Sequence, residues 1–224
     1  MTQSDSQKII STGATGDNEP KPHVVFIHGI AAPRFVFLYL KWYLSRRGFS
    51  SQIHAYWSSF RTIPIHADQF IETLRKVEAN PEIDRFHIVA HSMGGIVTRQ
   101  ALLKYRPQKL DKFLMLATPN QGSAAARVLS SSIFFFSKPL KQLSDAEGSY
   151  SRELGFPDGV EVGSIYANQD RVVARESCLS FPEVPFLEIA SGHTDLLIRP
   201  TTARAIVQFL RTGKFEIPAQ GASE

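Results

Sequence analysis

The chain contains a single cysteine, Cys178, among its 224 residues. One cysteine can form neither an internal disulfide bond nor a thiolate metal site. The seven histidines and the acidic residues show no spacing that is typical of a metal centre. We therefore expect no disulfide framework and no bound metal.

Long apolar runs and basic clusters are missing as well. No segment approaches the length needed to span a bilayer, and residues 1–21 are largely polar, unlike a secretory signal. The formal net charge is only +4, and Arg46 and Arg47 are the only adjacent arginines. These features predict a soluble cytoplasmic protein with no nucleic acid partner and no transmembrane segment, while transient membrane contact stays open.

Hydrophobic residues make up 43% of the chain, which favours a folded domain with a sizeable core. Residues 1–22 and 214–224 are predicted to be flexible tails around one domain at residues 23–213. Inside it, strand and helix patterns alternate, which predicts an α/β fold with about six mostly parallel strands and helices on both faces. The expected strands are residues 23–28, 51–57, 86–90, 112–117, 160–167 and 184–190. The expected helices are residues 35–44, 65–77 and 94–105, and one that begins near Pro200.

Ser92 lies where the third expected strand turns sharply into a helix, within RFHIVAHSMGGIV at residues 85–97. The pattern matches the nucleophile elbow G-x-S-x-G, with Ala90 in place of the first glycine. A helix N-terminus beside the hydroxyl would stabilise an anion formed during acyl transfer. The alternative is that Ser92 only caps the helix.

A nucleophilic serine needs a base, and the base needs an orienting acid. His193 follows the sixth expected strand and Asp170 follows the fifth, and parallel strands bring such positions to one edge of the sheet. The order Ser92, Asp170, His193 is the one expected for a triad on this kind of sheet. Asp195 and Glu188 are the rival acids, but Asp195 is too near His193 in sequence and Glu188 lies inside a strand.

The oxyanion of such a reaction needs two hydrogen-bond donors. The backbone N–H of Met93, next to the serine, is the first candidate. The second is the N–H of Ile30 in the loop after the first strand, where Gly29 permits a close turn. An ordinary strand-exit glycine is the alternative explanation for Gly29.

Together, these segments resemble the α/β-hydrolase superfamily, in particular small bacterial lipases and esterases with an AHSMG elbow. The resemblance implies a minimal α/β-hydrolase fold with Ser92 as nucleophile, His193 as base, Asp170 as acid, and Ile30 and Met93 as oxyanion donors. After His-Gly-Ile, however, alanine and proline replace the glycines that small lipases often carry. The matching segments are VVFIHGI, IVAHSMGGIVTR, LATPNQGS, QLSDAEGSYSREL, SIYANQDRVV and SGHTDLL.

The resulting prediction is a serine hydrolase that cleaves carboxylic esters or lipids through an acyl-enzyme on Ser92, without a cofactor. An acyltransferase or thioesterase with the same triad, or a catalytically silent binding protein on this fold, are the alternatives. Residues 120–156 break the strand–helix alternation and are expected to form a lid-like insertion. Its residues Phe134, Phe135 and Phe136 are candidates for substrate binding, with core packing as the alternative.

Overall fold

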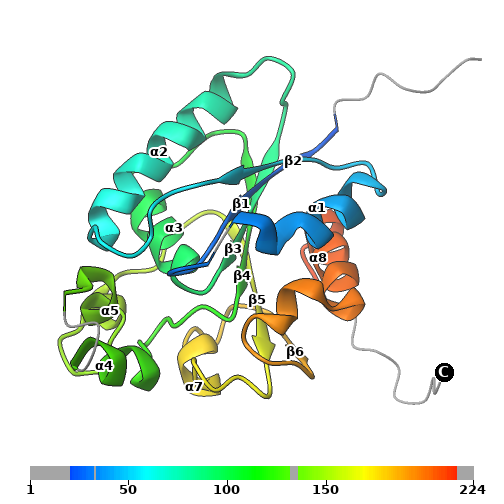
Figure 1. Cartoon of the computed structure of the whole chain (residues 1–224). Coiled ribbons are helices and arrows are strands. Elements are labelled where there is room, and N and C mark those ends of the chain that lie inside the picture. The colour runs from blue at the N-terminus through cyan, green and yellow to red at the C-terminus, as the bar shows by residue number, and fades with distance from the viewer. Residues whose placement is uncertain (1–20, 33, 132–135, 216–224) are drawn as a thin grey trace, which may run out of the picture.

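The computed structural model describes residues 21–32, 34–131 and 136–215. Its centre is one sheet of six parallel strands in the order β2-β1-β3-β4-β5-β6 (Figure 1). Because all neighbouring strands are parallel, their carboxyl ends meet at one edge of the sheet. The strands are β1 (His23–Ile27), β2 (Ser50–His54), β3 (Phe86–His91), β4 (Leu110–Leu116), β5 (Glu161–Ala167) and β6 (Phe186–Ile189).

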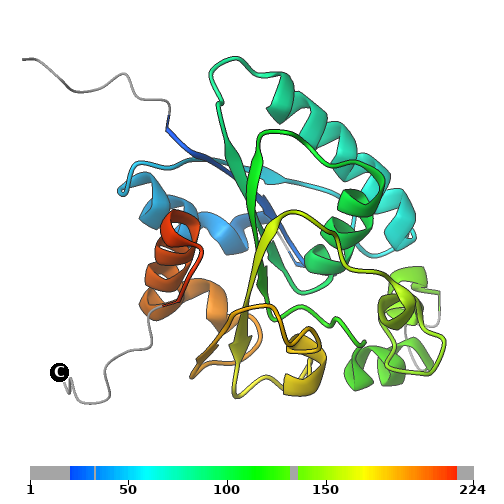
Figure 2. The ribbon, with the colours of Figure 1, turned by 180° about the vertical axis from the view of Figure 1, so that it is seen from behind.

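Helices cover both faces of the sheet. Helices α2 (Ile63–Ala79) and α3 (Met93–Lys104) pack on one face, and α1 (Leu38–Ser45) and α8 (Pro200–Thr212) pack on the other (Figures 1 and 2). Alternate strand residues supply the two cores: Val25 and Ile27 face α2 and α3, whereas Val24 and Phe26 face α1 and α8. All four side chains are fully buried, as expected for a central parallel strand.

The last helix illustrates how local sequence sets its bounds. Pro200 occupies the first helical position, where its missing N–H has no intrahelical partner to lose. Gly213 ends the helix in the left-handed region, with φ of 71°. Between them, the apolar residues recur at helical spacing and cover the sheet.

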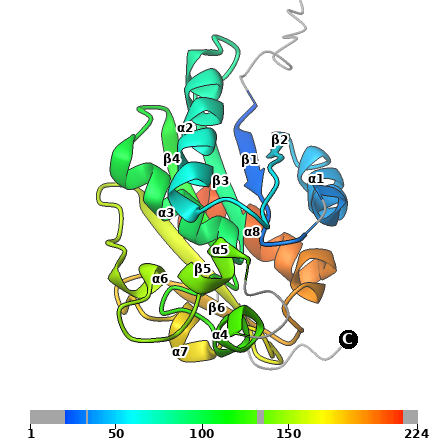
Figure 3. The same ribbon diagram turned by 60° about the vertical axis from the view of Figure 1, so that its left-hand side comes forward.

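The segment after β4 departs from the alternation, as the sequence predicts. It contains short helices near the carboxyl ends of the strands, and α4 and α5 lie side by side (Figure 3). These helices are α4 (Ala124–Ser131), α5 (Lys138–Gln142) and α6 (Tyr150–Glu153), and α7 (Arg175–Cys178) follows β5. Two 3-10 turns occupy Arg34–Phe37 and Asp195–Ile198.

The predicted α/β fold with six parallel strands is confirmed, with shifts at the ends of some strands. The second strand was expected to reach residue 57, but β2 ends at His54, because its partner β1 ends opposite at Ile27. The sixth strand is shorter than predicted for a related reason, since β6 pairs with β5 only over Phe186–Ile189. Most of both predicted tails, and also Phe134 and Phe135, lie outside the described residues. Of the helices described, none is long and apolar enough to cross a bilayer.

Candidate active site

Ser92 forms the turn between β3 and α3. Its backbone lies at φ 54° and ψ −126°, a region that residues other than glycine rarely adopt and that costs on the order of 1–3 kcal/mol. Two backbone hydrogen bonds hold it there: the Ser92 N–H donates to the carbonyl of Leu116 at 2.9 Å, and the Gly95 N–H donates to the carbonyl of Ser92 at 2.9 Å. At this strained turn, Ser92 belongs neither to β3, which ends at His91, nor to α3, which begins at Met93.

Two glycines make room for this turn. A Cβ on Gly94 would lie 2.6 Å from the carbonyl oxygen of Ile27, so the first turn of α3 can approach β1 only without a side chain. A Cβ on Gly29 would lie 2.8 Å from the Cβ of Ser92. The loop after β1 therefore packs its backbone directly against the serine side chain.

The structure brings Ser92, His193 and Asp170 into one hydrogen-bonded chain. The Nε2 of His193 lies 3.0 Å from the Oγ of Ser92, and its Nδ1 lies 2.6 Å from the Oδ2 of Asp170. The other carboxylate oxygen of Asp170 accepts the N–H groups of Val172 and Val173 at 2.7 and 2.9 Å. The Asp170 side chain is fully buried, whereas the side chain of His193 is 13% exposed and Ser92 is 7% exposed, so solvent reaches the chain at His193 and Ser92 and not at Asp170.

The surroundings of Asp170 keep its carboxyl group ionised and so determine which nitrogen of His193 carries the proton. Burial alone raises the pKa of the Asp170 carboxyl, but the hydrogen bond and charge of His193 and the two backbone donors outweigh it and hold this pKa below its usual value. An ionised Asp170 keeps a proton on Nδ1 of His193, because a carboxylate can only accept. Nε2 is then left as an acceptor for the Ser92 hydroxyl.

His91 supports the imidazole from inside the protein. Its Nε2–H donates to the backbone carbonyl of His193 at 3.1 Å, and the two ring centroids are 4.8 Å apart. Burial lowers the pKa of His91 to about 3, and the neighbouring charge of His193 lowers it further. His91 is therefore neutral at physiological pH and holds the His193 loop without adding a charge.

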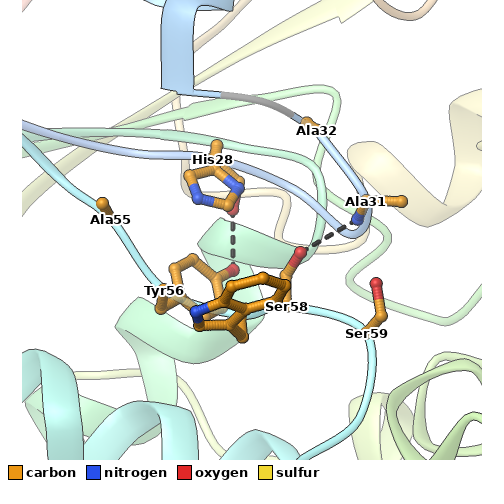
Figure 4. A pocket seen from close by; sticks show the side chains of 8 residues that line it. His28, Ala31, Ala32, Ala55, Tyr56, Ser58 and Ser59 are labelled. Atoms are coloured by element: carbon orange, nitrogen blue, oxygen red, sulfur yellow. Dashed lines mark hydrogen bonds between the residues drawn. The ribbon is translucent and has the colours of Figure 1, made fainter.

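The loop after β1 is fixed by its own side chains and by the loop after β2. The Nδ1–H of His28 donates to the carbonyl of Gly29 at 2.8 Å. In a planar trans peptide the N–H points away from the carbonyl, so this bond also sets the direction of the Ile30 N–H. Figure 4 shows the second set of contacts: the hydroxyl of Tyr56 donates to the carbonyl of His28 at 2.7 Å, and the N–H of Ala31 donates to Oγ of Ser58 at 2.9 Å.

A pocket of about 610 Å³ lies between these two loops. Ala31 and Ala32 line one side, and Tyr56 and Ser58 line the other (Figure 4), and Trp57 also lines the pocket. Trp57 is 83% exposed, so most of its indole faces solvent rather than the core. The pocket adjoins the loop after β1 and offers an apolar wall to a ligand.

The remaining sequence candidates fall into different places. Met93 is the first residue of α3, so its N–H has no intrahelical acceptor and stays available beside Ser92. The rival acids Asp195 and Glu188 are both exposed, and Glu188 lies 3.7 Å from Arg175 rather than at the imidazole.

Phe136 is 77% exposed, which contradicts core packing for this ring. Among the described residues, no group of three or more His, Cys, Asp and Glu side chains could hold a metal ion.

Hydrogen bonds tie the insertion to the rest of the domain at several points. Near its middle, the hydroxyl of Ser137 donates to the carbonyl of Ser59 at 3.0 Å, which brings Phe136 next to the loop that carries Trp57. At its end, the buried guanidinium of Arg99 on α3 donates to the carbonyls of Leu154 and Gly155. Sequence reasoning identified the insertion but missed Arg99, which gives no local signal because Leu154 and Gly155 lie 55 and 56 residues further along the chain.

A sheet of this topology, with a strained serine after its third strand and an imidazole and a carboxylate from the loops after β6 and β5, has the α/β-hydrolase fold. Residues 62–204 match the family model described as PGAP1-like alpha/beta domain, and the chain belongs to this family. No curated protein sequence matches the chain significantly.

Solved structures of similar fold include enzymes of bacteria and a fungus. The mature form of the Bacillus licheniformis lipase BlEst2 is 13% identical, with a TM-score of 0.67 over 90% of this chain and 95% of that one. Lipase B of Aspergillus fumigatus is 18% identical, with a TM-score of 0.69 over 89% of this chain and 55% of that one. Est1E from Butyrivibrio proteoclasticus is 14% identical, with a TM-score of 0.62 over 88% and 90%. At these identities the likeness concerns the fold.

Proposed function

We propose that the protein is a serine hydrolase that cleaves carboxylic esters through an acyl-enzyme on Ser92. The observation that carries this proposal is the chain of two contacts, 3.0 Å from Ser92 to His193 and 2.6 Å from His193 to Asp170. A serine that merely capped α3 would use its hydroxyl on the helix, but the Ser92 side chain makes no capping hydrogen bond in the described structure. Its hydroxyl oxygen lies at hydrogen-bond distance from Nε2 of His193 instead.

In the proposed reaction, Nε2 of His193 takes the proton of Ser92 as Oγ attacks the ester carbonyl. The N–H groups of Ile30 and Met93 stabilise the oxyanion, and Asp170 stabilises the imidazolium. His193 then protonates the leaving alcohol. A water molecule, deprotonated by His193, attacks the acyl-enzyme and releases the acid. The protein's own groups supply every step, so the reaction needs no cofactor.

The substrate is proposed to be an ester with an apolar part, in the class that includes lipids. Support comes from the pocket beside the loop after β1, which Trp57 lines, and from exposed rings on the two segments that Ser59 and Ser137 join. Trp57, Phe60 and Phe136 are 83, 70 and 77% exposed. Burying a methylene on such rings contributes about 0.8 kcal/mol. Phe134 and Phe135 remain proposed substrate-binding residues on the strength of the sequence. The names of the similar lipases agree with this substrate class.

The first test is covalent labelling of the full chain with a fluorophosphonate probe, followed by hydrolysis of p-nitrophenyl esters of rising acyl length. We expect the wild type to be labelled on Ser92, and Ser92→Ala to lose labelling and about 10⁴-fold or more of its turnover while keeping its melting temperature. Ser151, which is fully buried on α6, provides the matched control, because Ser151→Ala should leave labelling unchanged. A folded Ser92→Ala variant with ordinary turnover would refute the proposal.

The same acyl-enzyme could pass its acyl group to an alcohol, amine or thiol instead of water. An acyltransferase or thioesterase therefore stays the alternative enzyme, and a silent binding protein is the alternative without catalysis. Adding a competing alcohol to the assay separates the enzymes, because a transferase forms the new ester in preference to the free acid. Failure of the wild type to react with the probe would favour the silent protein.

A further inference from the structure

A second concave site lies at the opposite edge of the sheet, where the strands begin. This pocket of about 250 Å³ is formed by the start of β1, the turn between α1 and β2, the start of β3 and the end of α8. The pocket lies beside the ends of α1 and α8, which pack next to each other on one face of the sheet (Figure 2). Its lining residues are Pro22, Arg47, Gly48, Phe49, Arg85, His87, Leu210 and Arg211.

The pocket concentrates positive charge. Arg47, Arg85 and Arg211 come from three separate parts of the sequence, which is why no basic cluster is visible along the chain. Among the described residues that line the pocket, none is acidic. All three arginines are exposed, so water screens part of their mutual repulsion, and an anion in the cavity would lower that repulsion further.

Two of the arginines are held in place by neutral groups. Arg211 donates to the backbone carbonyl of Arg47 at 2.9 Å, and its guanidinium lies 5.9 Å from the ring centroid of Phe49. Arg47 donates to the carbonyl of Tyr43 at 3.1 Å and lies 3.4 Å from the centroid of its ring. Each guanidinium has five N–H donors, so these contacts orient the groups and leave donors for a ligand.

His87 adds a polar group to the wall of the pocket. It is 1% exposed, and its Nδ1 lies 3.8 Å from the nearest carboxylate oxygen of Asp111, which is beyond hydrogen-bond distance. Burial lowers the pKa of His87 to about 4; the Asp111 carboxylate opposes this, and the charges of Lys112 and Arg85 add to it. The ring is therefore neutral near pH 7 and carries one N–H that can donate.

We propose that this pocket binds a phosphoryl group, at a site separate from Ser92. A tetrahedral phosphate presents oxygens in several directions and so can accept from arginines on three sides, whereas a planar carboxylate presents one edge. The volume of about 250 Å³ holds a phosphate group with part of its ester substituent. The same chemistry occurs in soluble phosphate esters and in lipid headgroups.

The test is isothermal titration of the full chain with inorganic phosphate at low ionic strength. We expect saturable binding to one site, weakened about tenfold or more by Arg85→Gln and by Arg211→Gln, because a hydrogen bond to a charged group contributes on that scale. Arg46→Gln is the matched control: Arg46 adjoins Arg47 in sequence, but its guanidinium lies over the ring of Trp42 and does not line the pocket. This variant should bind phosphate like the wild type.

Arg85→Gln should fold like the wild type, because no hydrogen bond or ion pair of the described residues involves the Arg85 side chain. A loss of binding in this variant therefore does not come from misfolding. Absence of saturable binding up to about 10 mM phosphate, or equal weakening by Arg46→Gln, would overturn the proposal. Glycerol phosphate and vesicles of phosphatidylcholine with phosphatidic acid then identify the source. Binding of glycerol phosphate that depends on Arg85 supports a soluble ester, and vesicle binding with the same dependence supports a headgroup.

Discussion

At the scale of single residues, the acid of the proposed triad is the position for which the sequence offered several candidates, of which Asp170 was preferred. The structure places its buried carboxylate on the imidazole and leaves Asp195 exposed on a 3-10 turn two residues beyond His193. Two backbone donors fix the Asp170 carboxylate so that only one oxygen faces the ring. Its role in the proposed reaction is to hold the Nδ1 proton and so keep Nε2 free for Ser92.

We therefore expect Asp170→Asn to reduce kcat by about 10³- to 10⁴-fold, because an amide NH₂ can donate to Nδ1 and stabilise the wrong tautomer of His193. Asp195→Asn is the matched control and should change kcat by less than about tenfold. Both variants are measured by steady-state ester hydrolysis, with circular dichroism to check folding. A larger effect of Asp195→Asn would transfer the role of the acid to that residue.

Gly29 provides a test of the proposed role of the loop after β1 in binding the oxyanion. A Cβ at this position would lie 2.8 Å from Cβ and 3.3 Å from Oγ of Ser92, so Gly29→Ala must push the loop away from the serine. We expect kcat to fall about 100-fold, since displacement of a donor by about 1 Å has effects of that size. Gly155→Ala is the control, because its Cβ would meet only Leu103, at an ordinary 3.8 Å.

Retained kcat in Gly29→Ala, with an unchanged melting temperature, would show that the loop after β1 does not supply an oxyanion donor. If Gly155→Ala lost as much activity, the effect would have to come from the general stability of the domain. The pair of variants thus separates the local clash from any wider effect of adding a methyl group.

The residues of the proposed site were accessible to sequence reasoning because strand ends in a parallel sheet share one edge. Ser92, Asp170 and His193 each follow an apolar strand, and the sheet order brings those strand ends together. Tyr56 and Ser58, which hold the loop of His28, were not predicted. Their positions depend on how the chain leaves β2, and the sequence predicted the end of that strand three residues too late, at residue 57 instead of His54.

At the scale of secondary-structure elements, α3 links the proposed nucleophile to the insertion. Ser92 precedes the helix, and Arg99 lies two turns further along it, 1% exposed. Arg99 has no carboxylate partner among the described ion pairs; instead it donates to the carbonyls of Leu154 and Gly155 and to Oδ1 of Asn120 at 3.1 Å. Burial lowers the pKa of Arg99 to about 10, so the group stays charged at pH 7 and depends on these acceptors.

Replacing Arg99 by methionine should destabilise the protein by about 2–4 kcal/mol, because several buried acceptors then lose their donor. Urea unfolding measures this change, with Arg204→Met on the exposed side of α8 as the control that should stay within about 0.5 kcal/mol. We also expect faster proteolysis within residues 120–156 of Arg99→Met. Unchanged stability of Arg99→Met would mean that the insertion is held by other contacts.

At the scale of the whole molecule, the alternation of strands and helices predicted the fold, but not which residues from distant segments become neighbours. The pocket formed by Arg47, Arg85 and Arg211 shows this limit, since only the packing of α8 beside the first strands brings the third arginine close. The buried histidines show it as well. The sequence gives their number, whereas the degree of burial that decides their charge is a property of the folded core.

These histidines predict a loss of stability on acidification. Burial lowers the pKa of His54 and His87 to about 4 and that of His91 to about 3, compared with about 6.5 in an unfolded chain. Above about pH 6.5, both folded and unfolded chains hold these rings neutral, and the full stability is present. Between pH 6.5 and about 4, only the unfolded chain binds the protons, so the free energy of unfolding falls as the pH falls.

His54→Gln isolates one of these contributions. His54 lies beside the rings of Tyr56 and Phe70 and pairs its Nδ1 with the hydroxyl of Thr73 at 2.9 Å, away from the serine, so its replacement leaves the other histidines in place. Between about pH 7.5 and pH 5, the wild type should lose about 2 kcal/mol more unfolding free energy than His54→Gln, which follows from a pKa of 6.5 in the unfolded chain and about 4 in the folded one. Urea unfolding at both pH values measures the difference, and the carboxylates cancel because they are common to both proteins. Equal losses in the two proteins would mean that His54 takes up a proton in the folded state at pH 5, and that its site is wetter than the packing of its neighbours implies.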